Sequence, residues 1–263
     1  MCSPRTDLRA LIWDVDGTLA ETERDGHRVA FNAAFEALAV PWRWSEERYG
    51  ELLRVTGGVE RLLYDMAGQP VAPPAAQERE QLALRLHGEK NARYAQIVAA
   101  GGIALRGGVR ELLDECTAAG LPMAIATTTS RSNVDALLSA HLGARWRERF
   151  ACVVCAEDAP RKKPDPLAYR LVLQGLGLRG HEALAIEDSP AGVQAGVSAR
   201  LPVVATRSEY FANASLPGAM AVGPGLDRAE GWQPAACASA ARIGLDQLRR
   251  WFATSRALGS IHG

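Results

Sequence analysis

Between residues 22 and 100 the apolar positions recur only at the spacing of α-helices. Residues three and four apart share one face of a helix, so this spacing gives each helix an apolar stripe. The first predicted helix starts at His27, and Phe31 and Phe35 lie four apart along it. Three more helices are predicted at 46–53, 59–66 and 78–99. The segment therefore predicts a small, all-helical block.

On both sides of this block, short apolar runs alternate with amphipathic helical patterns. The predicted strands are 8–12, 121–127, 152–156, 183–186 and 202–206, and the predicted helices are 109–119, 133–141, 167–176 and one that starts at Pro190. Repeated β-α-β units form a parallel sheet with helices on both faces. The residues after Thr206 predict a less regular tail.

These patterns predict an α/β protein with a Rossmann-like parallel sheet and an inserted α-helical domain. We expect the sheet domain to comprise residues 1–22 and 100–263, and the helical domain to comprise residues 23–99. The predicted hinge between them consists of residues 21–24 and 104–107. Gly101, Gly102 and Gly107 lie close to the second segment, and glycine tolerates the changes of backbone conformation that a hinge requires.

Four polar clusters lie at the carboxyl ends of predicted strands. They are Asp14 with Asp16, the hydroxyl cluster 127–130, Lys162 with Lys163, and Glu187 with Asp188. Each cluster alone is also typical of a polar turn. In a parallel sheet, however, these strand ends meet at one edge, and ligands bind beyond that edge. Four clusters of complementary chemistry at one edge predict a functional site.

The residue types in these clusters favour one kind of chemistry. Two acidic pairs that converge on one point repel each other unless a cation lies between them. Carboxylate oxygens are suitable ligands for Mg²⁺, which usually accompanies phosphate. A lysine and hydroxyl groups at neighbouring strand ends bind phosphate oxygens. Together these groups predict phosphoryl transfer through an aspartyl-phosphate.

The overall composition argues against several other classes of protein. The 263 residues have a formal net charge of zero and no basic stripe, so we expect neither a nucleic-acid nor an anionic-membrane partner. No apolar run approaches the ~20 residues of a membrane span. The first apolar stretch has the pattern of a strand rather than of a signal peptide. We expect a cytoplasmic protein, or one of the plastid stroma if it is eukaryotic and processed.

The five cysteines are odd in number and irregularly spaced, which does not indicate a disulfide framework. Cys152 and Cys155 have the spacing of a redox or zinc motif, but they lie in a continuous apolar run. Residues three apart on a strand face opposite ways, so these two thiols would not meet. Core packing is therefore predicted for both.

The polar clusters also carry a resemblance to a known superfamily, the haloacid dehalogenase-like hydrolases. Residues 14–18 (Asp-Val-Asp-Gly-Thr) resemble its first motif, Thr127 the second, Lys163 before Pro164 the third, and Glu187-Asp188 the fourth. The resemblance covers nearly the whole chain. It implies that the helical block is the α-helical cap that members of this superfamily carry after the first motif.

The resemblance implies that Asp14 is the nucleophile and that Asp16 is the general acid and base. The other implied site residues are Thr127 and Lys163 in the catalytic set, and Asp188 and Glu187, which bind Mg²⁺ together with Asp14 and the Asp16 carbonyl, Glu187 in a supporting role. Asp16 favours a phosphatase or mutase over a dehalogenase, because an alkoxide leaving group needs a proton and a halide does not.

Within the superfamily, residues 16–23, 126–130 and 160–166 resemble the CbbY-type sugar-phosphate phosphatases linked to the Calvin cycle. Relatives of that group hydrolyse xylulose-1,5-bisphosphate. The implied substrate-binding residues are Glu21, His27, Arg61, Lys90, Thr128 and Thr129. A bisphosphate needs a second cationic site, which Arg61 and Lys90 would supply. The chain departs from this pattern at Val59, where close relatives usually carry a lysine.

Three other functions are alternatives for a protein with these residues. A β-phosphoglucomutase-like enzyme returns the phosphoryl group to a sugar instead of water, and a broad-specificity sugar-phosphate phosphatase accepts many esters. A binding module without turnover typically lacks one of the carboxylates or the lysine, and this chain keeps them all. We expect a monomer whose partner is a small-molecule sugar phosphate.

Overall fold

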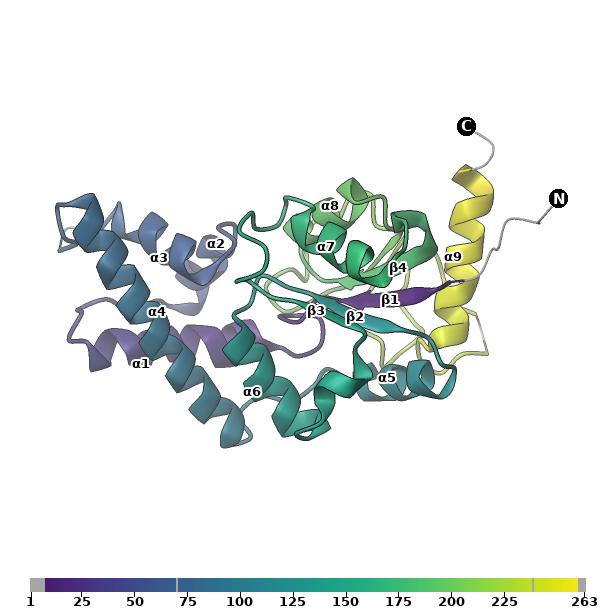
Figure 1. Ribbon diagram of the computed structural model, residues 1–263, viewed down its shortest axis with the longest axis horizontal. Coiled ribbons are helices and arrows are strands. Elements are labelled where there is room, and N and C mark those ends of the chain that lie inside the picture. Colours follow the sequence, from purple (N-terminus) through teal and green to yellow (C-terminus); the bar gives the residue numbers. More distant parts are fainter. Residues whose placement is uncertain (1–7, 70, 238, 260–263) are drawn as a thin grey trace.

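The computed structural model describes residues 8–69, 71–237 and 239–259. Within them a six-stranded parallel sheet forms the centre of one lobe (Figure 1). Its strands are β1 (Ala10–Trp13), β2 (Met123–Ala126), β3 (Cys152–Val154), β4 (Ala183–Glu187), β5 (Val203–Thr206) and β6 (Ala221–Gly223). Their spatial order is β3-β2-β1-β4-β5-β6, so β1 is central and pairs with β2 and β4. The predicted Rossmann-like α/β fold is confirmed.

Helices cover both faces of this sheet. They are α5 (Val109–Ala118), α6 (Arg131–Leu142), α7 (Leu167–Leu176), α8 (Pro190–Ser198) and α9 (Leu245–Gly259), with the 3₁₀ turns η2 (Trp146–Arg149) and η3 (Gly180–Glu182). Apolar residues of α5, α6 and α9 pack on one face and those of α7 and α8 on the other. Figure 1 shows α5 and α6 below the sheet and α7 and α8 above it.

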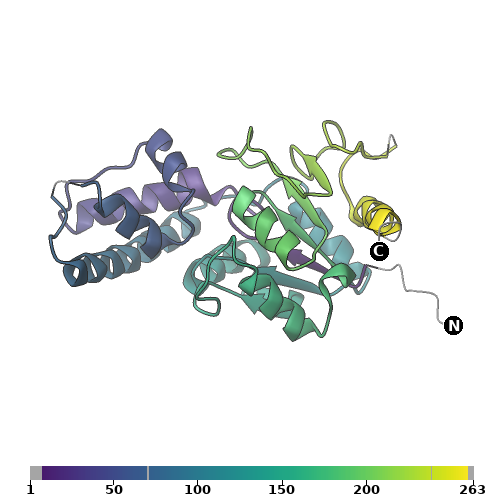
Figure 2. The same cartoon turned by 90° about the horizontal axis from the view of Figure 1, so that it is seen from above.

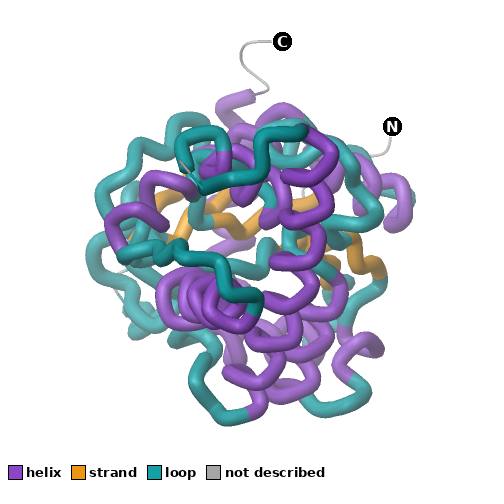
Figure 3. Tube along the Cα trace, turned by 90° about the vertical axis from the view of Figure 1, so that its left-hand side faces the viewer, coloured by secondary structure: helices purple, strands orange, loops and turns teal. Residues whose placement is uncertain are grey.

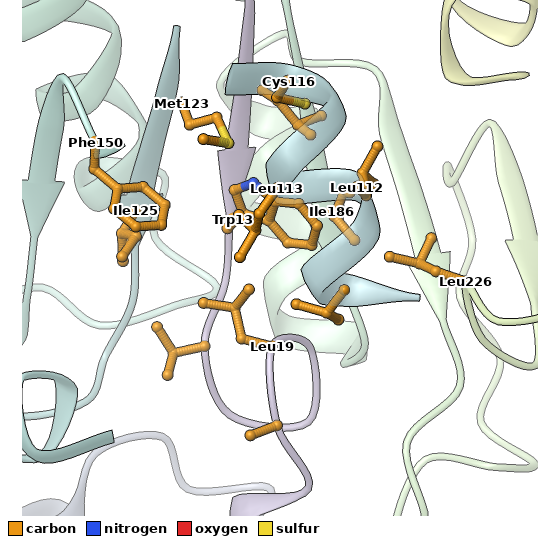
Figure 4. Packing of buried hydrophobic residues seen from close by; sticks show 14 of the residues in the cluster. Trp13, Leu19, Leu112, Leu113, Cys116, Met123, Ile125, Phe150, Ile186 and Leu226 are labelled. Atoms are coloured by element: carbon orange, nitrogen blue, oxygen red, sulfur yellow. The ribbon is translucent and has the colours of Figure 1, made fainter. Parts of the chain in front are cut away.

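Trp13, the last residue of β1, anchors the central strand in the core. Its side chain is fully buried, in the same apolar cluster as Leu113, Ile125 and Ile186 (Figure 4). Side chains alternate along a strand, so the ring of Trp13 and the carboxylate of Asp14 point to opposite sides. The large apolar ring therefore fixes β1 without occupying the edge of the sheet where Asp14 lies.

Cys152 and Cys155 lie in the apolar clusters of opposite faces of the sheet. Both are free thiols, and Cys152 packs closely against Gly175 of α7. The predicted packing role of this CxxC pair is confirmed.

A second lobe, at the left of Figure 1, consists of helices that pack on one another. Its elements are the π-helical turn η1 (Glu23–Arg28), α1 (Val29–Ala37), α2 (Glu46–Leu52), α3 (Gly58–Met66) and α4 (Ala76–Ala99). We call this lobe, residues 23–99, the cap. Phe31, Phe35, Trp44 and Tyr49 form its aromatic centre. Figure 2 shows the cap beside the sheet lobe, and in Figure 3 its helices lie in front of the strands. The exact domain boundaries stay a prediction.

The two segments that connect the lobes lie side by side. Ala20 and Leu105 form an antiparallel bridge, and the Arg106 amide donates to the Leu19 carbonyl at 2.9 Å. The Arg106 guanidinium also donates to the carbonyl of Gly17 in the first motif. The predicted hinge segments are thus adjacent in space, and their motion stays a prediction.

Some predicted elements were wrong in detail. The residues after Thr206 contain β6 and α9, not only an irregular tail. β6 has three residues, too few to show a period of two, whereas α9 does carry an apolar stripe that includes Leu248 and Phe252. The helical conformation of the cap begins at Glu23 rather than His27, and β1 covers Ala10–Trp13 rather than 8–12.

Among the described residues, no helix combines the length and the apolar character that a membrane span requires.

Candidate active site

The register of the parallel sheet brings the first and fourth motifs together. Trp13 of β1 lies opposite Ile186 of β4, and the Asp14 amide donates to the Ile186 carbonyl at 3.1 Å. The residues that follow these two strands, Asp14 on one side and Asp188 on the other, therefore emerge at the same edge. All three carboxylates of this edge, those of Asp14, Glu187 and Asp188, are buried.

Lys163, in the loop that follows β3, contacts two of these carboxylates. Its Nζ donates to Asp14 Oδ1 and to Glu187 Oε1, each at 2.6 Å. The Tyr169 hydroxyl of α7 donates to the same Glu187 oxygen at 2.6 Å. Burial alone would lower the pKa of Lys163, but the negative charges of Asp14 and Glu187 raise it above its ordinary value. Lys163 is therefore a fixed positive charge beside Asp14.

The acidic group suits a divalent cation. One ligand atom from each of Asp14, Glu187 and Asp188 lies within 4.8 Å of the others. Burial, opposed by Lys163 and reinforced by Glu187, raises the pKa of Asp14 to about 7. Burial and the charges of Asp14 and Glu187 raise the pKa of Asp188 well above its ordinary value. Of these three carboxylates, only Asp14 and Glu187 contact Lys163, so negative charge remains that a hard cation with oxygen ligands would neutralise.

Gly17 and Ser208 shape the side of this acidic group that faces β5. Gly17 has a φ of +75°, and a Cβ at this position would lie 2.0 Å from Asp188 Oδ2. Glycine is therefore required both for the turn and for the close approach. The Ser208 hydroxyl donates to the same Asp188 oxygen at 2.5 Å.

Asp16 faces the cap rather than the acidic group. Its Oδ1 accepts a hydrogen bond from the Thr22 hydroxyl at 2.6 Å and lies 2.9 Å from His27 Nε2, and its Oδ2 accepts from the Thr129 hydroxyl. Burial would raise the pKa of Asp16, but the charge and hydrogen bond of His27, with the Thr22 hydroxyl, lower it below its ordinary value. The His27 ring stacks on Tyr94 with centroids 4.4 Å apart, which fixes its position.

Arg61 and Lys90 lie on cap helices and are both buried. Arg61 Nη1 donates to the Tyr49 hydroxyl at 2.8 Å, and its Cζ lies 5.1 Å from the centre of that ring. Lys90 Nζ lies 5.2 Å from the centre of the Phe31 ring. Burial lowers the pKa of Lys90 to about 8, although Asp16 attracts its charge. The predicted cap cations thus face inward instead of being solvated.

The groups of both lobes line one cavity. Its volume is about 400 Å³, and its lining includes Asp14, Asp16, Arg61, Thr128, Lys163 and Asp188. A smaller hollow of about 40 Å³ adjoins it and includes His27, Lys90 and Thr129 in its lining. A larger hollow of about 650 Å³ lies against α5 and α9, and it contains none of the predicted site residues.

Three predicted site residues do not line either of the two joined hollows. Glu187 is fully buried behind them, where Lys163 and Tyr169 donate to its carboxylate. Thr127 is buried beneath the hollows, where its hydroxyl accepts from the Thr129 amide at 3.2 Å. Glu21 is paired with Arg106 at 3.3 Å at the base of the hinge. The structure thus gives Glu21 a partner outside the cavity, and its contact with substrate stays a prediction.

Sequence reasoning missed several residues that line the two hollows or contact the residues that do. His87 lines the smaller hollow with Lys90, and burial and the charge of Lys90 lower its pKa to about 4. His87 lies three residues before Lys90 on α4, and residues three apart share a helix face. This spacing could have predicted that His87 lies beside Lys90. Glu23, Tyr49 and Ser208 gave no such signal, since their contacts depend on tertiary structure.

Comparison with known proteins agrees with this site. A family model described as haloacid dehalogenase-like hydrolase matches residues 8–200. The CbbY protein of Cupriavidus necator is 46% identical over 220 residues, which cover 83% of this chain and 86% of that protein. A CBBY-like protein of Arabidopsis thaliana is 33% identical over 84% of this chain and 71% of that protein. The chain belongs to the haloacid dehalogenase-like hydrolases and is an enzyme of that class, as its motifs predicted.

Solved structures show the same similarity. The crystal structure of a CbbY variant from Rhodobacter sphaeroides in complex with xylulose-(1,5)bisphosphate has a TM-score of 0.75 and 39% sequence identity, and the match covers 81% of this chain and 92% of that one. A β-phosphoglucomutase from Clostridium difficile has a TM-score of 0.71 at 19% identity, which shows the shared fold alone.

Proposed function

We propose that the protein is a Mg²⁺-dependent phosphatase of a small sugar phosphate, with xylulose-1,5-bisphosphate as its preferred substrate. The observation that carries this proposal is the pair of adjoining hollows, with Asp14 and the acidic group on one wall and Arg61 and Lys90 on the other. A substrate with two phosphates matches both walls. The bisphosphate bound to the similar CbbY of Rhodobacter sphaeroides supports this choice.

In the proposed reaction, a carboxylate oxygen of Asp14 attacks the phosphorus and the bond to the sugar oxygen breaks. Asp16 gives its proton to that oxygen, and an aspartyl-phosphate remains on Asp14. Water then attacks the phosphorus and Asp16 takes a proton from it. The bond between the phosphorus and the Asp14 oxygen breaks, which restores the Asp14 carboxylate and releases inorganic phosphate. The lowered pKa of Asp16 favours the ionised form that the second step needs. For the first step Asp16 must take up a proton, which the negative charge of a bound phosphate favours by raising the pKa of Asp16.

Lys163 and the metal would neutralise charge around Asp14. Lys163 Nζ lies 2.6 Å from Asp14 Oδ1, within reach of an oxygen on the transferred phosphoryl group. We assign Asp14, the Asp16 carbonyl and Asp188 as the residues that would hold Mg²⁺, with Glu187 in support. When bound, the ion would reduce the repulsion between the anionic nucleophile and the anionic phosphate.

The test is release of phosphate by the purified protein with Mg²⁺. The panel contains xylulose-1,5-bisphosphate, ribulose-1,5-bisphosphate, fructose phosphates and β-glucose 1-phosphate, and the control is Asp14→Asn. We expect the highest kcat/KM on xylulose-1,5-bisphosphate. Uniformly weak hydrolysis would instead indicate a broad-specificity phosphatase. Glucose 6-phosphate without free phosphate would indicate a mutase. Either result would refute the proposed substrate.

A further inference from the structure

Residues 207–214, the first part of the loop between β5 and β6, contact both lobes, and we call them the bridging loop. It is braced from within, because the Arg207 guanidinium donates to the carbonyls of Ala212 and Ala214 at 2.8 and 2.9 Å. The Arg207 carbonyl accepts in turn from Arg106 at 2.6 Å. These hydrogen bonds fix the conformation of the loop and attach it to Arg106.

At its core end, the bridging loop contacts the acidic group. Ser208 donates to Asp188 at 2.5 Å, and both residues are almost fully buried. One oxygen of a carboxylate that we assign to the metal is thus fixed by this loop. The loop also contributes Phe211 to the lining of the main cavity.

At its cap end, the bridging loop packs on α2. The rings of Tyr210 and Tyr49 have centroids 5.8 Å apart, and Glu209 forms an ion pair with Arg24. Gly50 lies within α2, where glycine costs roughly 1 kcal/mol relative to alanine. A Cβ at Gly50 would lie 3.0 Å from the Tyr210 ring. The close contact with Tyr210 therefore favours glycine at position 50.

Tyr49 connects Tyr210 of the bridging loop to Arg61 of the cap. Its hydroxyl donates to Glu23 at 2.5 Å and accepts from Arg61 at 2.8 Å. Arg61 Nε has no hydrogen-bond partner among the described residues, although it is buried. The Arg61 guanidinium is thus held in the cavity by the Tyr49 side chain and by Glu23, which lies 4.0 Å away, and Tyr210 packs against the Tyr49 ring.

We propose that the bridging loop determines the distance between the acidic group and Arg61. In this proposal Tyr210 is a positioning residue that acts through Tyr49. This inference rests on the proposed function. It assigns to the loop the preference for sugar phosphates that carry a second anionic group at the Arg61 end. Monophosphates contact only the core end and gain nothing from the Tyr210 contact.

The test is a double-mutant cycle of Tyr210→Ala and Arg61→Ala. The readout is the ratio of kcat/KM on xylulose-1,5-bisphosphate to kcat/KM on p-nitrophenyl phosphate, which has no second anion. Tyr210→Ala should lower this ratio about tenfold, the value of one good aromatic contact. Combined with Arg61→Ala it should lower the ratio no further. Tyr210→Phe should keep the wild-type ratio, because the Tyr210 hydroxyl has no hydrogen-bond partner among the described residues.

Two controls separate positioning from general damage. Leu84→Ala removes an exposed apolar side chain from α4 and should leave the ratio unchanged. If Tyr210→Ala does not fold, Tyr210→Leu replaces it in the cycle. An equal loss on both substrates, or a further tenfold loss in the Arg61→Ala background, would overturn the positioning role.

A measurement without turnover separates this inference from the proposed function. Small-angle X-ray scattering with MgCl₂ and inorganic phosphate should show a larger radius of gyration for Tyr210→Ala than for the wild type and Tyr210→Phe. If the wild type releases no phosphate from xylulose-1,5-bisphosphate, the proposed substrate fails, and a larger radius for Tyr210→Ala still supports the role of the loop. An unchanged radius in that case overturns it.

Discussion

The two walls of the cavity carry opposite charge and are built in different ways. On the core wall, three buried carboxylates lie at the ends of strands whose register is fixed by the sheet, and two of them, Asp14 and Glu187, contact Lys163. On the cap wall, Arg61 and Lys90 lie on helices that pack on an aromatic centre. The core wall thus holds the reacting groups in a rigid frame, whereas the cap wall places its cations only when the cap lies against the sheet lobe.

This difference assigns the two walls different roles in the proposed function: the core wall would carry out the reaction, and the cap wall would select the substrate. A parallel sheet brings the ends of its strands to one edge whatever the substrate is, so the core wall can serve many phosphate esters. In the proposed function, the reacting phosphorus lies at the core wall, and the buried cations of the cap wall would distinguish substrates by a second anion. Changes on the core wall should therefore affect kcat on every substrate, and changes on the cap wall should affect the ratio between substrates.

The largest expected effect comes from Asp14→Asn on the core wall. The amide keeps the shape of the side chain but cannot form the aspartyl-phosphate, so phosphate release should fall roughly 10⁶-fold on every substrate, as in other enzymes that lose their nucleophile. Turnover by this variant close to the wild-type rate on any ester of the panel would contradict the assignment of Asp14.

The same variant should not lose stability. The fold raises the pKa of Asp14 from 3.8 to about 7, so the folded state favours the neutral form. This contribution to stability is present at acid pH and is lost as the pH rises from 3.8 to about 7. At pH 8 without Mg²⁺ the asparagine variant should therefore unfold at the same or a higher temperature than the wild type. A lower unfolding temperature in differential scanning fluorimetry would show that the ionised Asp14 is net favourable.

The core wall was also the part that sequence could predict. Asp14, Glu187 and Asp188 follow apolar runs directly, and the rule that ligands bind at the carboxyl ends of parallel strands was sufficient to bring them together. The same rule placed Lys163 near them, because its loop follows β3.

The cap wall could be predicted only in part. Arg61 and Lys90 are one charge each on an amphipathic helix, where helical spacing alone does not tell a buried cation from a solvated one. Their candidacy came from the family resemblance, and so did that of Glu21, which the structure pairs with Arg106. Tyr49, Ser208 and Tyr210 gave no sequence signal, since their contacts join segments that are far apart in the chain.

A smaller effect on the cap wall should appear as a pH dependence. Burial lowers the pKa of Lys90 to about 8, so its ammonium loses its proton as the pH rises past 8. The kcat/KM on xylulose-1,5-bisphosphate should then fall by up to about tenfold for each further pH unit. Lys90→Arg stays charged in this range, so its profile should be flat between pH 8 and 9.5. An alkaline limb that persists in Lys90→Arg would show that another group titrates.

The smallest expected effect is at Val59, where this chain lacks the lysine that the CbbY-type pattern usually has. Val59 is part of a hollow that also contains His87 and Lys162, next to the cap wall. Val59→Lys should lower the KM for xylulose-1,5-bisphosphate about threefold, the value of one partly exposed charge contact, and leave the KM for p-nitrophenyl phosphate unchanged. Val59→Met, which is long but neutral, is the matched control. If both variants change both substrates alike, the effect arises from packing in the cap. A change confined to the lysine variant and to the bisphosphate would show that the cap wall selects by charge and still accepts one more cation.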